Sequence, residues 1–303
     1  MIIAVTGSSG LVGTALVDAL EAQGQHVRRI VRRPTKGQGQ GQGHDEIRWD
    51  PAGGTIEAAQ LSGVDAVVHL AGEGIAAHRW SESVKNKIRD SRVKGTRLLC
   101  ETLASLAVKP AVLVSASAIG YYGDRGDEPV DESSPPGRGF LAEVCQAWEA
   151  ATHPARDADI RVVNLRIGVV LSSKGGALAQ MLTPFRLGLG GVIGSGRQYI
   201  SWIALDDLVR VVQFTLHAAA LCGPVNAVAP APATNREFTK TLGHVLRRPT
   251  VLPMPAAAAR LAFGEMADAM LLGGARVEPR ALSAAGFEFK FPQLEPALRH
   301  VLP

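Results

Sequence analysis

The chain opens with an apolar run, a glycine-rich join and an amphipathic stretch. Residues 2–6 (IIAVT) are apolar, and the segment TALVDALEAQG places Leu16, Ala19 and Leu20 at helical spacing. The glycine-rich string GSSGLVG joins the two, and HVRRIVRR resumes just after Gly24, a residue typical of helix C-termini. The pattern therefore predicts a strand, a glycine loop, a helix and a second strand by residue 33.

The same alternation continues through the first half of the chain. Further strands are expected at 64–72, 111–117 and 160–171, and further helices at 81–106 and 139–152. Strands that alternate with helices through short joins indicate an α/β fold with a Rossmann-type doubly wound parallel sheet.

Beyond residue 171 the pattern changes. An extended stretch at 198–204 and a helix at 206–216 are followed by a Pro/Ala-rich region. We expect a first domain at 1–171, completed by part of 198–222, and a smaller α-rich C-terminal lobe at 172–303.

Composition narrows the class of protein. The 303 residues are 46% hydrophobic and 20% charged, which excludes a disordered chain. The net charge of +4 is weak evidence for nucleic acid, because the aromatic share is 5% and no basic stripe accompanies it. Three distant cysteines without C-x-x-C spacing argue against a disulfide framework and a metal site. No apolar run of about 18 residues or basic leader occurs, so we expect a cytoplasmic protein without a membrane partner.

The candidate cofactor site is the glycine loop. It consists of Gly7, Ser8, Ser9, Gly10, Leu11, Val12 and Gly13. A G-x-x-G-x-x-G string alone is weak evidence, but here it follows a strand and opens a helix within a βαβ unit. The first glycine permits the turn, the second lets backbone N–H groups approach a pyrophosphate, and the third lets helix and strand pack closely.

The end of the second strand predicts which dinucleotide binds. Asp or Glu there favours NAD, whereas arginine accommodates the 2′-phosphate of NADP. The chain has Arg32 and Arg33 at this position and no acid before Asp45. We therefore predict NADP(H).

Several motifs resemble the extended short-chain dehydrogenase/reductases of the NAD-dependent epimerase/dehydratase family. The matching strings are TGSSGLVG, DAVVHLAG, SRVKGT, VSASAIGYYG and SWIALDDL. Further strings, including GEGIAAHRW, CQAWE and GEMADAMLLGGARVEP, resemble an atypical branch of epimerase-family proteins without a well-established substrate. The resemblance covers nearly the whole chain and implies a dinucleotide-binding fold, in which Leu70, Ala71 and Gly72 border the cofactor.

The chain departs from that family at the residues that usually transfer the proton. The family has Asn, Ser and a Tyr-x-x-x-Lys pair, and the spacing from Ser117 places Leu141 and Cys145 at the tyrosine and lysine positions. Arg92 stands at the asparagine position. Only Ser117 is retained, and leucine cannot exchange a proton with a substrate oxygen.

Other residues near the expected strand ends are candidates for this chemistry. We expect Ser117, with Tyr121 or Tyr122 as the acid, to be catalytic, and Arg92 to contact the cofactor or an anionic substrate. The candidate substrate-binding residues are Glu73, Gln198 and Trp202. Each also has a structural alternative, since a tyrosine or tryptophan often packs in a core.

The leading hypothesis is an NADP(H)-binding oxidoreductase or epimerase-like enzyme that acts on a small molecule. The alternative is a protein that binds NADP(H) as a sensor or scaffold without redox chemistry. A sugar-nucleotide epimerase using the usual tetrad is disfavoured, because its proton shuttle is missing. Helices flanking the sheet could pair two copies into a homodimer, and the sequence does not distinguish this from a monomer.

Overall fold

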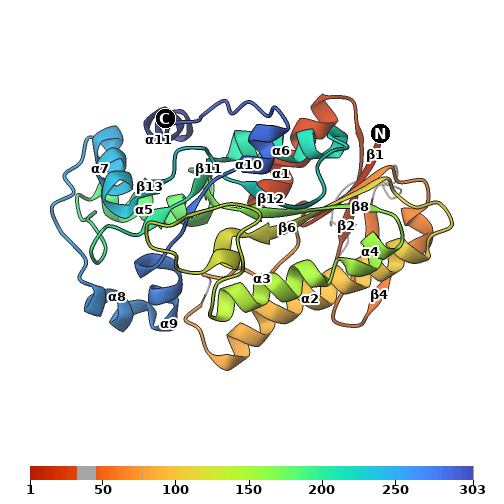
Figure 1. Cartoon of the computed structure of the whole chain (residues 1–303), viewed down its shortest axis with the longest axis horizontal. Helices are drawn as coiled ribbons and strands as arrows, with labels where there is room; N and C mark the ends of the chain where they lie inside the picture. Colours follow the sequence, from red (N-terminus) through yellow and green to blue (C-terminus); the bar gives the residue numbers. More distant parts are fainter. Residues whose placement is uncertain (33–45, 77, 303) are drawn as a thin grey trace, which may run out of the picture.

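The computed structural model describes residues 1–32, 46–76 and 78–302 (Figure 1). Arg33, one of the two arginines expected at the cofactor's 2′-phosphate, lies outside the described residues.

An eight-stranded sheet forms the centre of the molecule (Figure 1). The strands lie in the order β12-β8-β6-β5-β1-β2-β3-β4, and each pair is parallel apart from β3 with β4. Their bounds are Ile2–Thr6 (β1), His26–Val31 (β2), Glu46–Asp50 (β3), Thr55–Ile56 (β4), Ala66–His69 (β5), Val112–Ala118 (β6), Arg161–Ile167 (β8) and Gly223–Ala227 (β12). The predicted doubly wound parallel sheet is confirmed.

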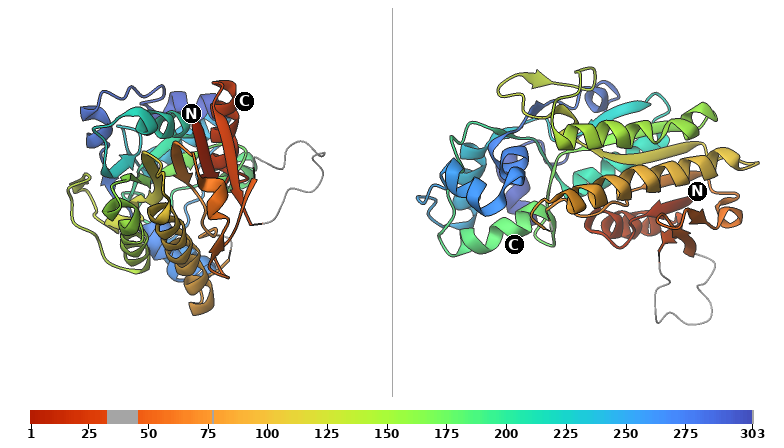
Figure 2. Two further views of the ribbon diagram at one scale, coloured as in Figure 1. Left: turned by 90° about the vertical axis from the view of Figure 1, so that its right-hand side faces the viewer. Right: turned by 90° about the horizontal axis from the view of Figure 1, so that it is seen from below.

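Helices cover both faces of the sheet. On one face lie α1 (Leu11–Ala22) and α6 (Leu205–His217), which contact each other. On the other face lie α2 (Glu82–Ser105), α3 (Phe140–Ala150) and α4 (His153–Asp157). Figure 2 shows α2 and α3 running side by side, with the C-terminal lobe beyond one end of the sheet.

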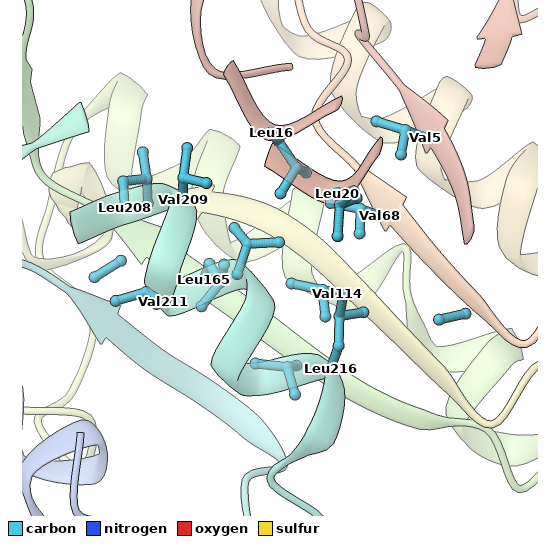
Figure 3. Packing of buried hydrophobic residues seen from close by; sticks show 14 of the residues in the cluster. Val5, Leu16, Leu20, Val68, Val114, Leu165, Leu208, Val209, Val211 and Leu216 are labelled. Carbon is cyan, nitrogen blue, oxygen red and sulfur yellow. The ribbon is translucent and has the colours of Figure 1, made fainter. Parts of the chain in front are cut away.

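The largest core lies between the sheet and the α1/α6 face (Figure 3). Leu16 and Leu20 are four residues apart on α1, so both face the sheet, where they pack with Val68. From α6, Leu208 and Val211 reach the same core at a three-residue spacing. This periodicity explains why these segments fold as helices against a continuous apolar surface.

Two expected elements are shorter than their apolar patterns predict. The helix expected at 139–152 is α3, which ends two residues earlier at Ala150, and the strand expected at 160–171 is divided into β8 and β9 (Val169–Leu171). Gly168 causes this division, because its N–H donates to the carbonyl of Ala227 while β9 pairs with another strand. A Cβ on Gly168 would lie 2.6 Å from the carbonyl oxygen of Ser201.

The C-terminal lobe has its own apolar core. Its elements are α5 (Gly176–Arg186), β10 (Tyr199–Ile200), β11 (Trp202–Ala204), β13 (Ala233–Thr234), α7 (Asn235–Leu246), α8 (Ala256–Phe263), α9 (Glu265–Ala267), the π-helix η3 (Asp268–Leu272), β14 (Arg276–Val277) and α11 (Leu294–Val301). Helix α10 (Arg280–Ala284) instead packs on the core of the central sheet, where Leu282 is buried. Strand β14 pairs with β7 (Pro129–Val130), so this part of the chain returns to the loops beside the sheet. Within the described residues, no helix is long and apolar enough to cross a membrane.

Candidate active site

The carboxyl ends of the parallel strands meet at one edge of the sheet, and most candidate residues follow them. The glycine loop comes after β1, Gly72 comes after β5, and the short helix η2 (Ile119–Tyr122) comes after β6. In open α/β sheets this edge is the usual place for ligands.

Gly7 and Gly13 are required by the packing of the loop. Gly7 has a φ of +66°, and a Cβ there would lie 2.8 Å from the carbonyl carbon of Leu70. A Cβ on Gly13 would lie 2.1 Å from the carbonyl oxygen of Gly7. Both distances are too short for real side chains, so only glycine lets the loop pack against β5 and the first turn of α1.

Gly10 has a different environment. It is exposed, and a Cβ there would have one close neighbour, the Gly7 carbonyl oxygen at 3.3 Å. Helix α1 begins at the next residue, Leu11, without a side-chain cap. Its first N–H groups have no intrahelical partner, so this helix end can take a phosphate.

Among the described arginines on and just after β2, Arg32 is exposed, whereas Arg28 and Arg29 are half-buried. Arg28 donates from Nη1 to the carbonyl of Gln60 at 2.8 Å, and Arg29 pairs with Glu21 at 3.0 Å. Arg32 is therefore the described arginine of this segment best placed to meet a ligand.

A buried histidine lies under the glycine loop. His69 Nδ1 lies 2.7 Å from Thr6 Oγ1, and its Nε2 lies 2.9 Å from Thr96 Oγ1. Thr6 Oγ1 already accepts from the N–H groups of Leu70 and Ala71, so its own proton points to His69 Nδ1. Burial lowers the pKa of His69 to about 4, so the ring is neutral and its Nε2 carries the proton.

Arg92 extends from α2 to the same edge. Its guanidinium carbon lies 5.0 Å from the ring centre of Trp148, and Nη1 donates to the carbonyl of Ile88. A Cβ on Gly72 would lie 3.3 Å from that guanidinium carbon. Burial lowers the pKa of Arg92, and the nearby Glu73 opposes this. Arg92 therefore lies beside the loop that follows β5.

A buried ion pair connects Ser117 with η2. Arg166 donates from Nε and Nη2 to the two carboxylate oxygens of Glu149, at 2.8 and 2.9 Å. Ser117 donates to Glu149 Oε1 at 2.7 Å. Burial would lower the pKa of Arg166, but its hydrogen bonds to Glu149 and the carboxylate charge raise it above its ordinary value. The hydroxyl proton of Ser117 is thus directed at a carboxylate rather than at the strand edge.

The two adjacent tyrosines have different environments. Tyr122 is fully buried, donates to Asn226 Oδ1 at 2.7 Å and accepts from Arg166 Nη1 at 3.0 Å. Burial raises its pKa to about 12. Tyr121 is half-buried, with the Arg166 guanidinium carbon stacked 3.4 Å from its ring centre. Of the two phenols, Tyr121 is the one with solvent access.

Leu141 and Cys145 lie on the side of α3 that faces η2. A Cβ on Gly120 would lie 3.3 Å from the Leu141 Cβ and 3.8 Å from the Cys145 sulfur. Burial raises the pKa of the Cys145 thiol to about 12, so the thiol stays protonated. Leu141 and Cys145 therefore present no charged group to Gly120.

The three candidate substrate residues are not brought together. Trp202 is fully buried in the C-terminal core, and its indole N–H donates to the Ala231 carbonyl. Gln198 is 8% exposed and donates from Nε2 to the carbonyls of Ile193 and Leu271. Both side chains therefore hold the lobe together. Glu73 is exposed and borders a hollow beside α2.

Sequence reasoning gave no role in the site to Glu149, Arg166 or His69. His69 ends an otherwise apolar strand, and Arg166 lies with Asn164 among the buried apolar residues of β8; these polar interruptions are the signals that could have identified them. Glu149 belongs to the CQAWE string, which marks its position but not its contacts. Within the described ranges, no group of three or more His, Cys, Asp or Glu residues is arranged to hold a metal ion.

The model of the NAD dependent epimerase/dehydratase family matches residues 3–226, which contain the sheet and the glycine loop. The chain belongs to this family. A second model, a domain of unknown function called DUF1731, matches residues 254–301 of this family member. Epimerase family protein MT2273 of Mycobacterium tuberculosis is 48% identical over 98% of this chain and 96% of its own.

Solved structures agree with this assignment. The crystal structure of human epimerase family protein SDR39U1 (isoform 2) with NADPH has a TM-score of 0.89 at 37% identity, over 99% of both chains. A nucleoside-diphosphate sugar epimerase from Corynebacterium glutamicum has a TM-score of 0.81 at 38% identity, over 100% of this chain and 58% of its own. The resemblance to the epimerase/dehydratase family is thereby confirmed.

Proposed function

We propose that the chain is an NADP(H)-binding oxidoreductase or epimerase-like enzyme that acts on a small molecule. The observation that carries this proposal is the open helix end at Gly10, held by two glycines that cannot be replaced. Gly7 to Gly13 would hold the cofactor phosphates, and Leu70, Ala71, Gly72 and Arg92 would border its remainder. When bound, the nicotinamide supplies or takes the hydride.

We assign the 2′-phosphate of NADP(H) to Arg32. The exposed side chain at the end of β2 supports this assignment, as does the NADPH in the human SDR39U1 structure. Calorimetric titration of NADPH and NADH tests it. We expect Arg32→Asp to lower the affinity for NADPH by about tenfold or more and to leave the affinity for NADH unchanged or higher. Arg97→Asp, on the exposed side of α2, is the matched control. An unchanged preference in Arg32→Asp would exclude the assignment.

We assign the proton chemistry to Tyr121, with Ser117 as a hydrogen-bond acceptor toward the substrate. Ser117 donates its proton to Glu149, so its remaining capacity is to accept. The hydroxyl of Tyr122 is buried and bonded, whereas Tyr121 is partly accessible and has its ring held by Arg166. Tyr121 would therefore exchange the proton with the substrate oxygen.

Paired phenylalanine variants test this role, with a substrate found by metabolite screening. Tyr121→Phe should reduce turnover about 100-fold or more at unchanged NADPH affinity. Tyr122→Phe should retain most turnover and lose stability instead, because Asn226 and Arg166 lose a buried partner. Full turnover in Tyr121→Phe would exclude Tyr121 as the acid.

A second candidate function is an NADP(H) sensor or scaffold without redox chemistry. The apolar surroundings of Gly120, formed by Leu141 and Cys145, favour it, since no tyrosine or lysine side chain enters from α3. We would measure NADPH oxidation at 340 nm with a panel of carbonyl compounds. Oxidation by any of them favours the enzyme, and an inert cofactor that alters affinity for a partner protein favours the sensor.

We further propose that residues 1–171, together with α6 and β12, hold the cofactor and that the rest of 172–303 meets the substrate. The cytoplasm as the site of action, and a homodimer, remain predictions from the sequence. Cell fractionation and analytical ultracentrifugation test these two.

A further inference from the structure

A chain of buried hydrogen bonds lies beneath the loop that follows β5. The N–H groups of Leu70 and Ala71 donate to Thr6 Oγ1 at 3.0 and 3.2 Å. The Thr6 hydroxyl lies 2.7 Å from His69 Nδ1, and His69 Nε2 lies 2.9 Å from Thr96 Oγ1. Thr6, His69 and Thr96 are fully buried, so each polar atom depends on its protein partners.

The bonds of this chain have a fixed direction. A threonine hydroxyl has one proton and two lone pairs, and N–H groups occupy both lone pairs of Thr6. Its proton is therefore donated to His69 Nδ1, which accepts because the neutral ring carries its proton on Nε2. On the other side of the ring, Thr96 Oγ1 accepts from His69 Nε2 and from the indole N–H of Trp148. The imidazole is thus an acceptor toward β1 and a donor toward α2.

The loop held by this chain packs directly against the glycine loop. A Cβ on Gly7 would lie 2.8 Å from the carbonyl carbon of Leu70 and 3.0 Å from the nitrogen of Ala71. Gly7 follows Thr6 in the sequence, so the hydroxyl that holds the loop after β5 belongs to the strand end that begins the glycine loop. Without an acceptor at His69 Nδ1, the Thr6 hydroxyl turns its proton elsewhere and its lone pairs away from the two N–H groups. The spacing between the two loops is then no longer fixed.

We propose that His69 is a positioning residue for cofactor binding, which acts through Thr6 to hold Leu70 and Ala71 against the glycine loop. This role rests on the proposed NADPH site at these two loops. His69 is fully buried beneath them, so it contacts no ligand itself. An apolar residue of similar size would fill the same space, but it could not accept the Thr6 proton. The acceptor at Nδ1, rather than the volume of the ring, is the property that matters.

Two amide substitutions separate the two sides of the imidazole. The asparagine amide reaches the position of Nδ1 and can accept from Thr6, whereas the longer glutamine amide reaches the position of Nε2 and can donate to Thr96. In calorimetric titrations at neutral pH, His69→Asn should keep an NADPH affinity within about threefold of wild type, and His69→Gln should lose about tenfold or more. Thermal unfolding should show lower stability in both variants, because each leaves one buried partner unpaired. A merely structural role would lower affinity and stability together.

Ser115 provides the matched control. It lies beside His69 in register on β6, is equally buried, and its hydroxyl contacts the Ala116 carbonyl rather than the hydrogen-bond chain. Ser115→Ala removes a buried hydroxyl at the same level of the sheet, so it should leave the NADPH affinity unchanged. A loss equal to that of His69→Gln would overturn the specific role of His69.

Substitutions of Thr6 test whether His69 acts through this residue, and they decide the matter even if His69→Gln does not fold. Thr6→Val keeps the shape of the side chain and removes its hydroxyl, so it should lower the NADPH affinity as much as His69→Gln. Thr6→Ser keeps the hydroxyl and should retain the affinity. The double variant Thr6→Val/His69→Gln should bind NADPH no more weakly than either single variant.

The outcomes separate this role from the cofactor site on which it rests. The proposal is overturned by a folded His69→Gln or Thr6→Val that binds NADPH like wild type, by an equal loss in His69→Asn, or by losses that multiply in the double variant. Wild-type protein that bound no NADPH would refute the cofactor site itself, and the role of His69 would fall with it.

Discussion

At the scale of single residues, the Glu149–Arg166 pair has the largest expected energetic effect. The side chains are 13% and 3% exposed, and they share two hydrogen bonds. Removing one partner of a buried pair leaves an uncompensated charge, which costs more than the pair itself contributes. We expect Glu149→Ala to lower the free energy of unfolding by about 3–5 kcal/mol in urea titrations.

Glu143 provides the matched control on the same helix. Its side chain is 64% exposed and lies 3.7 Å from Arg89. Such surface pairs contribute less than about 1 kcal/mol, so Glu143→Ala should be close to wild type. Equal losses in the two variants would contradict the buried-pair account.

His69 makes the stability of the protein depend on pH. Its pKa is lowered to about 4 by burial, whereas the unfolded chain binds the proton near 6.5. The contribution of neutral His69 to the free energy of unfolding is therefore fully present above about pH 6.5. It is lost as the pH falls toward 4, by about 3 kcal/mol in total. Unfolding measured across this range should show a shallower decline in His69→Gln. Equal slopes would mean that His69 is not the group responsible.

The candidate residues differ in how far sequence could identify them. Gly7 and Gly13 belong to a local motif, so their spacing between an apolar strand and a helix was enough to predict the loop. The hydrogen bonds of Ser117 and Tyr122 depend on how β6, β8 and α3 pack together. No local sequence pattern encodes these contacts. From the sequence, Trp202 could either contact a ligand or pack in the core. Its complete burial shows that it packs in the core.

At the scale of elements, the glycine loop yields a graded series of variants. Gly13→Ala places a methyl group 2.1 Å from a carbonyl oxygen, so it should cost more than about 3 kcal/mol of stability. In Gly24→Ala the added methyl group has no close neighbour. Its only cost is the strain of an alanine at a φ of +74°, which should lower stability by about 1 kcal/mol. Gly10→Ala should stay folded and weaken NADPH binding. Thermal unfolding and cofactor titration measure the series, and a stable Gly13→Ala would contradict the described packing.

The positions of most strands and helices could be predicted from apolar periodicity, but some of their ends could not. The apolar run at 160–171 continues across Gly168, where tertiary contacts divide it between two sheets. Likewise, the pattern at 139–152 does not show that α3 stops at Ala150. Long-range partners, rather than local preference, determine these boundaries.

At the scale of the whole molecule, Asp207 ties the C-terminal segment to the domain that contains the sheet. Its carboxylate is 1% exposed and accepts from the N–H groups of Lys290 and Phe291. Asp207→Ala leaves these donors unpaired, so we expect a loss of about 2–4 kcal/mol and faster hydrogen exchange at both amides. Asp206→Ala, which removes an exposed contact with His300, should leave hydrogen exchange at the Lys290 and Phe291 amides unchanged. Equal exchange in both variants would contradict the assignment.

The lobes also contact each other near the cofactor edge. Lys85 on α2 pairs with Glu265 at 3.1 Å, and Arg79 packs against Gly264. The cofactor loop and the C-terminal lobe thus flank one region, in which we expect the cofactor and the substrate to meet.

A crystal structure of the complex with NADPH tests the proposed cofactor site. We expect the pyrophosphate at the N–H groups of Gly10 to Val12, the 2′-phosphate against Arg32, and the nicotinamide beside η2 near Tyr121. A cofactor bound away from the glycine loop, or a 2′-phosphate without contact to Arg32, would contradict it.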